Sequence, residues 1–380
     1  MRICKFLCLS TAWILFCAVA LGAAWTKKQL SPDNVLAENA DVAVSGSKIY
    51  TVWNYDYGQQ IFFKRSIDNG ATWEPRKQIR VCDPSSVVTS PAIAASGANV
   101  YVVWTDSAFD TEGYWEIGFR RSADYGATWQ PIKRLTYTAG SSQWQAIAAD
   151  GANVYVVWSD ETPGNFQTYF RRSTDHGATW LPSQRLENNA DFTCAPAVAA
   201  NGSDVYVVWV DWIGGQGDIF FRKSTDYGAT WNLAKQLTAN PAYSSWPAIE
   251  ADGGDNVYVV YYDRTSGKYD IYLRKSTDKG VTWQAAKKLT NNAGGSEIPD
   301  MAVKGTNICV AWQDATPGNY EIYYKQSTDG GASWEAEQRL TDNTADSTYP
   351  AVACNSSKVY VVWQNVHGPY SLTYVKYSPL

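Results

Sequence analysis

The octapeptide Ser66-Ile67-Asp68-Asn69-Gly70-Ala71-Thr72-Trp73 has the form S-x-D-x-G-x-[ST]-W, and the chain contains this box six times. Successive copies lie about 50 residues apart, a spacing typical of folds built from repeated supersecondary units. The Asp carboxylate can accept backbone N–H bonds within a tight turn, and the Gly supplies a positive φ. We interpret the box as a structural turn, not a catalytic motif. Its copies begin at Ser66, Ser122, Ser173, Ser224, Ser276 and Ser327.

Four short β-rich runs accompany each box, and they are clearest around the fourth copy, at residues 196–199, 205–209, 218–223 and 235–238. The second run is the most regular of the four and always ends in Trp or Tyr. It occurs seven times, so the chain has one more repeat than it has boxes. The second runs are residues 49–53, 100–104, 154–158, 205–209, 257–261, 308–312 and 359–363.

The two ends of the repeat region complement each other. The chain ends after a third run, residues 371–377, while residues 25–31 resemble a fourth run. Pairing these two runs would close a ring and remove an exposed sheet edge. The pattern therefore predicts an all-β protein, a seven-bladed β-propeller of four-stranded antiparallel blades. We expect one domain over residues 25–380, closed by the N-terminal strand joining the last blade.

The start of the chain and its composition restrict location and partners. Residues 1–24 have the charged start, apolar run and small-residue end of a cleaved signal peptide, and no later stretch is long and apolar enough for a membrane span. We expect a secreted or periplasmic monomer. A net charge of −5, with Lys and Arg spread along the repeat, argues against nucleic acid as a partner. With two His residues and no C-x-x-C pair, we expect neither a metal nor another cofactor.

Candidate ligand-binding residues lie on the face opposite the boxes, where the turn between the second and third runs and the links between blades come together. There, a carboxylate follows the second run in five repeats, and aromatic residues precede the first run in three. Aromatic rings beside polar groups suit a sugar, although the repeated Asp could instead cap the following turn and the aromatic rings could simply cover the channel. The candidates are Trp144, Trp246, Tyr349, Asp106, Asp160, Asp211, Asp263, Asp314 and Arg264.

The boxes, their spacing and the strand pattern resemble the Asp-box (bacterial neuraminidase repeat) proteins over nearly all of residues 25–380. That resemblance implies a propeller of the sialidase-like superfamily, whose members include glycoside hydrolases, lectin-like proteins, sorting receptors and assembly factors. Sialidases carry an Arg-Ile-Pro motif and three arginines that grip the substrate carboxylate. This chain has no Arg-Ile-Pro, and only Arg264 and Arg80 lie where they could reach the open face.

Three functional hypotheses follow. The first is a non-catalytic protein that binds a glycan or another extracellular polymer on the open face through Trp144, Trp246 and Tyr349. The alternative is a sialidase-like exo-glycosidase, since a suitably spaced pair of carboxylates is enough for glycoside hydrolysis. The second alternative is a scaffold that presents its rim to an envelope protein. The sequence alone does not identify catalytic carboxylates.

Overall fold

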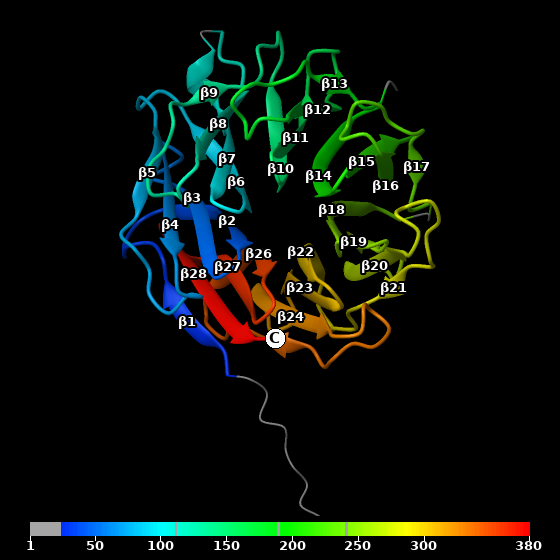
Figure 1. Cartoon of the computed structure of the whole chain (residues 1–380). Coiled ribbons are helices and arrows are strands. Elements are labelled where there is room, and N and C mark those ends of the chain that lie inside the picture. The colour runs from blue at the N-terminus through cyan, green and yellow to red at the C-terminus, as the bar shows by residue number, and fades with distance from the viewer. Residues whose placement is uncertain (1–23, 111, 188–190, 240–241) are drawn as a thin grey trace, which may run out of the picture.

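The computed structural model describes residues 24–110, 112–187, 191–239 and 242–380. Seven four-stranded antiparallel sheets form a ring of blades around a central channel, as Figure 1 shows. This confirms the predicted seven-bladed propeller. Most of the predicted signal peptide, residues 1–23, lies outside the described residues. Within the described ranges, no helix is long and apolar enough to cross a membrane.

The four strands of each blade follow one another from the channel to the rim (Figure 1). Blade 1 contains β2 (Ala37–Ser45), β3 (Lys48–Tyr55), β4 (Gln60–Ser66) and β5 (Lys77–Val81). Blade 2 contains β6 (Val88–Ser96), β7 (Asn99–Asp106), β8 (Glu116–Ser122) and β9 (Lys133–Arg134), with the 3-10 helix η1 (Ser107–Phe109) after β7. Blade 3 contains β10 (Ser142–Asp150), β11 (Asn153–Asp160), β12 (Gln167–Ser173) and β13 (Gln184–Arg185).

The remaining blades repeat the same order. Blade 4 contains β14 (Thr193–Asn201), β15 (Asp204–Ile213), β16 (Gln216–Ser224) and β17 (Lys235–Gln236). Blade 5 contains β18 (Ser244–Ala251), β19 (Val257–Asp263), β20 (Asp270–Ser276) and β21 (Lys287–Lys288). Blade 6 contains β22 (Ser296–Lys304), β23 (Asn307–Asp314), β24 (Glu321–Ser327) and β25 (Gln338–Arg339). Blade 7 contains β26 (Asp346–Cys354), β27 (Lys358–His367), β28 (Tyr370–Pro379) and β1 (Thr26–Gln29).

The core lies between neighbouring blades. Tyr155, Val157 and Phe170 of blade 3 pack with Val207 and Trp209 of blade 4 in one buried cluster. Both faces of a second strand are covered by sheets, and this explains why these runs are apolar throughout. Each such side chain contributes roughly 1.5–3 kcal/mol when it is fully buried.

The box pins one blade to the preceding one. In blade 4, Asp226 accepts hydrogen bonds from the Thr230 amide at 2.8 Å and the Thr230 hydroxyl at 2.6 Å. Gly228 has a φ of +81°, and a Cβ at this position would lie 2.4 Å from Cζ of Phe170 in blade 3. Trp231 packs edge-on against the same Phe170 ring at 4.9 Å. These contacts confirm the structural interpretation of the box.

The ring closes where its two ends meet. Thr26 of β1 pairs with Tyr377 of β28, and the antiparallel register continues to Gln29 opposite Tyr374. In Figure 1, the blue strand β1 accordingly lies beside the red strand β28. The predicted closure by the N-terminal strand is therefore confirmed, and blade 7 has no exposed third-strand edge.

Candidate functional site

The innermost strand of every blade contains a β-bulge at the open end of the channel. In β10, for example, the register shifts between Gln143 and Ala146, so two residues oppose one on β11. One bulge residue in each blade adopts a left-handed backbone, although none of the seven is glycine. Such conformations cost free energy in side-chain-bearing residues, and bulges re-aim side chains. The seven residues are Asn39, Ser90, Trp144, Ala195, Trp246, Ile298 and Tyr349, with φ between 48° and 54°.

These bulges surround a cavity of about 320 Å³, which we call the channel mouth. Its lining includes the predicted aromatic residues Trp144, Trp246 and Tyr349, which come from blades 3, 5 and 7. Trp246 and Tyr349 each keep 39% of their surface exposed. Trp144 is half-buried and packs against Phe166 at 5.0 Å and Phe192 at 6.0 Å. The fold thus brings three residues far apart in sequence to one opening.

The structure places the predicted ring of aspartates differently. Asp160 is fully buried and accepts hydrogen bonds from the indole Nε1 of Trp158 at 3.1 Å, the Ser142 hydroxyl at 2.8 Å and the Thr162 amide at 3.0 Å. These contacts match the turn-capping interpretation. Since the carboxylates have almost no exposed surface, we leave them out of the ligand-binding surface. All five, Asp106, Asp160, Asp211, Asp263 and Asp314, are at most 2% exposed.

The two arginines that were expected to reach the open face lie away from the channel mouth. Arg80 forms an ion pair with buried Asp106 at 2.7 Å. Arg264 is exposed on the loop after β19, where its guanidinium lies 5.7 Å from the centre of the Tyr269 ring. Among the described residues that line the channel mouth there is neither arginine nor lysine.

Two carboxylates at the channel mouth were not among the predicted site residues. Asp41 and Asp300 line the cavity two positions after the left-handed residue of blades 1 and 6. The other five blades have alanine at this position, namely Ala92, Ala146, Ala197, Ala248 and Ala351. An alignment of the seven repeats, position by position, would have shown both substitutions.

The local environment disfavours the charged forms of these carboxylates. Burial raises the pKa of Asp41 to about 6 against the opposing effect of two backbone hydrogen bonds. Burial also raises the pKa of Asp300 to about 7, with a further contribution from the charge of Asp41. Deeper in the channel, Glu250 replaces the alanine of the other blades, and burial together with Asp300 raises its pKa. The channel therefore holds three interacting carboxyl groups.

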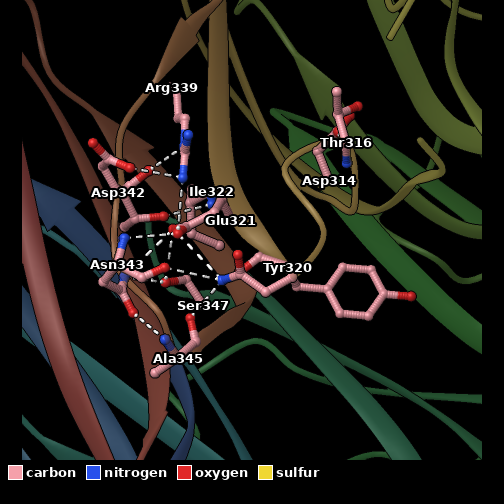
Figure 2. A network of polar contacts seen from close by, with 12 residues as sticks. Asp314, Thr316, Tyr320, Glu321, Ile322, Arg339, Asp342, Asn343, Ala345 and Ser347 are labelled. Carbon is pink, nitrogen blue, oxygen red and sulfur yellow. Dashed lines mark hydrogen bonds and ion pairs between the residues drawn. The ribbon is translucent and has the colours of Figure 1, made fainter. Parts of the chain in front are cut away.

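A polar network holds the link that leads to Tyr349, as Figure 2 shows. The buried carboxylate of Glu321 accepts hydrogen bonds from the Asn343 amide at 2.8 Å and from Nη2 of Arg339 at 3.1 Å. Burial acts to raise the pKa of Glu321, but the hydrogen bonds outweigh it and the pKa is lowered. Asn343 Nδ2 also donates to the Ser347 hydroxyl at 3.1 Å. The network fixes the chain two residues before Tyr349.

The described residues offer no conventional metal site. Within the ranges that the structure describes, no three His, Cys, Asp or Glu side chains are grouped as metal ligands would be. The channel mouth combines aromatic faces, two carboxylates and backbone groups instead. Such a lining can cover the apolar face of a sugar and hydrogen-bond its hydroxyl or amino groups.

The fold and its boxes define a β-propeller of the sialidase-like class. Residues 91–310 match the BNR repeat-like domain, and the chain belongs to this family. Among solved structures, it is similar to the Hadza microbial sialidase Hz136 (TM-score 0.56, 15% identity, covering 87% of this chain and 77% of that one). It is also similar to a PL25 ulvan lyase (TM-score 0.61, 10% identity, covering 90% and 94%). At these identities the likeness shows the fold alone.

Curated relatives are named as xyloglucanases and a sialidase. The xyloglucanase Xgh74A of Acetivibrio thermocellus is 28% identical over 181 residues, which cover 42% of this chain and 20% of the relative. A sialidase of Bacteroides fragilis is 24% identical over 279 residues, covering 61% of this chain and 49% of the relative. The chain thus spans less than half the length of the curated relatives it matches.

Proposed function

We propose that this protein is an exported, non-catalytic glycan-binding propeller that holds sugar rings in the channel mouth. The observation that carries the proposal is the placement of Trp144, Trp246 and Tyr349 on equivalent left-handed bulges around one cavity. The bulge itself does not require an aromatic residue, because Ser90 and Ala195 occupy it in other blades. Large rings left partly exposed at such positions are suited to stacking on a ligand.

The relatives support a carbohydrate as the ligand. The proteins to which this chain is similar are named as a xyloglucanase and sialidases, and a fold neighbour is an ulvan lyase. The predicted signal peptide at residues 1–24 supports a secreted or periplasmic location, where extracellular polymers would be available.

A glycan array tests this proposal. Residues 25–380 should bind a subset of glycans, and Trp144→Ala with Trp246→Ala should weaken that binding by about tenfold or more, which is the loss expected for two stacking rings. Tyr125→Ala with Tyr227→Ala is the matched control. These tyrosines have φ of 60° and 61° and exposures of 39% and 42%, but they belong to boxes on the opposite face. An equal loss in both double variants would contradict the proposed site.

A glycoside hydrolase is the second candidate, and the carboxylates at the channel mouth favour it. Asp41 and Asp300 line the same cavity as the aromatic residues, and two carboxyl groups with raised pKa suit acid and base roles. If the protein cleaves a glycoside, Asp41→Asn and Asp300→Asn should each abolish turnover while the protein still binds the sugar. Lack of turnover on a broad glycoside panel would contradict the hydrolase and leave glycan binding as the function.

The hypothesis of an envelope scaffold stays a prediction. Failure of the protein to bind any glycan on the array would favour it.

A further inference from the structure

The two carboxylates at the channel mouth lie across the cavity from its two tryptophans. Blades 1 and 6 both carry Glu-x-x-Asp around the left-handed residue, at residues 38–41 and 297–300. Their aspartates, Asp41 and Asp300, line the cavity from two blades that flank blade 7. Trp144 and Trp246 line it from blades 3 and 5. A ligand in the cavity would therefore meet the two tryptophans on one side and, on the other, the two carboxylates with Tyr349 of blade 7 between them.

The repeat shows that the fold does not need these two aspartates. Oδ2 of Asp41 accepts the Ile93 amide of blade 2 at 2.8 Å, and Oδ2 of Asp300 accepts the Val352 amide of blade 7 at 2.6 Å. The other five blades form the same bulge with alanine at this position. A carboxylate oxygen has two lone pairs, so each of these oxygens keeps the capacity to accept a further bond.

The aspartates also lack a counter-charge in the cavity, since neither arginine nor lysine lines it among the described residues. Two carboxylates that share a cavity without a cation carry an energetic cost, which a bound cation would relieve. Glu250 adds a third carboxyl group further along the channel. The aromatic residues are compatible with the same ligand charge, because the faces of Trp and Tyr rings attract cations.

We infer that the channel mouth selects amine-bearing sugars over carboxylate-bearing ones, with Asp41 and Asp300 as the specificity-determining residues. This inference rests on the proposed glycan-binding function. An ammonium group on the bound sugar would donate hydrogen bonds to Asp41 and Asp300 while the sugar ring stacks on Trp144 or Trp246. The carboxylate of a uronic or sialic acid would meet like charges there and would be rejected.

Three hexasaccharides of different charge test this inference at neutral pH. They are the β-1,4-glucosamine hexamer, its fully N-acetylated form, which has the same backbone but no charge, and a galacturonate hexamer. The glucosamine hexamer should bind about tenfold or more tightly than the acetylated one, while the galacturonate hexamer should bind weakest. The double variant Asp41→Asn, Asp300→Asn should remove the preference for the amine, so that its affinities for the glucosamine and acetylated hexamers become equal. Asparagine keeps an acceptor for the neighbouring amide, so we expect this variant to fold.

A second double variant controls for the overall negative charge. Asp83→Asn with Asp255→Asn removes two charges from exposed side chains that lie outside the channel mouth. This variant should keep the preference for the glucosamine hexamer. Equal affinity of the unmodified protein for all three hexamers, or an amine preference that survives in Asp41→Asn, Asp300→Asn, would overturn the inference. If the amine preference fails in this way but Trp144→Ala with Trp246→Ala still weakens binding of the acetylated hexamer, the proposed glycan-binding function stands without the inference.

Discussion

The six boxes and the seven bulges at the channel mouth each repeat a backbone conformation around the ring, but only the boxes also repeat their side chains. Each of the six boxes repeats its side chains as well, down to the hydrogen bonds between Asp and the residue four positions later. The seven bulges at the mouth repeat only the left-handed φ, while the residue varies from Ala195 to Trp246. Where side chains repeat they build the fold, and where only the backbone repeats the side chains are free to specify a ligand.

The largest effect should come from adding a methyl group to a box. Gly228→Ala should destabilise the protein by about 3–5 kcal/mol, because alanine must adopt the positive φ and its Cβ would collide with the Phe170 ring. Gly202→Ala is the control, since its φ is +59° but no atom lies within 4 Å of the added Cβ. That variant should lose only about 1 kcal/mol. Urea denaturation of both variants measures the difference, and equal losses would contradict the packing role of the box.

A smaller loss is expected when a box loses its carboxylate. Asp124→Ala removes acceptors for the Thr128 amide and hydroxyl, so it should cost about 2 kcal/mol at pH 7. Burial opposes ionisation of Asp124, but its hydrogen bonds outweigh burial and lower the pKa to about 2. Because the folded-state pKa lies below the unfolded one, this stability is present above about pH 4 and is lost as pH falls toward 2.

Denaturation of Asp124→Ala beside the unmodified protein at pH 7 and pH 3 measures this dependence. The gap between the two proteins should be smaller at pH 3. An unchanged gap would show that the carboxylate acts through its shape and not through its charge.

At the channel mouth, removing charge should stabilise the protein. The pKa values of Asp41 and Asp300 are raised in the folded state, so the stability from their protonated forms is complete below about pH 4 and is lost as pH rises through 6 to 7. Asp41→Asn with Asp300→Asn should therefore gain on the order of 1 kcal/mol over the unmodified protein at pH 8 and much less at pH 5. Thermal melting at both pH values checks this. A destabilised variant at pH 8 would show that the carboxylates serve the fold.

The smallest effect on stability should come from an aromatic residue at the mouth. Trp246→Ala should change the free energy of unfolding by less than about 0.5 kcal/mol, because Ala195 occupies the equivalent position in blade 4. The same variant should lose glycan affinity. A loss of more than about 2 kcal/mol in urea denaturation would place Trp246 with the scaffold instead.

The whole ring could be predicted from the sequence because the strand pattern occurs seven times and the box six times. The fourth run that the last repeat lacks was supplied by residues 25–31. The sequence also grouped Trp144, Trp246 and Tyr349, since equivalent positions of a ring share one end of the channel. The repeated aspartates were predicted to bind a ligand because their spacing alone does not show which way a carboxylate points. Asp106 lies two residues after buried Trp104, on the same side of the strand, and bonds its indole Nε1 at 2.9 Å. Asp41 and Asp300 were missed because the repeats were compared at the bulge residue and not at the position two residues later.

The seam between β1 and β28 also sets the order in which the molecule can assemble. Each of the first six blades is made from one continuous segment, so its strands can pair soon after they meet. Thr26 must instead wait for Tyr377, its partner near the other end of the chain. Contacts between such distant segments form slowly, and an unpaired strand edge invites pairing with another molecule. We therefore expect the pairing of β1 with β28 to form last. Before it forms, two incompletely closed rings could exchange strands.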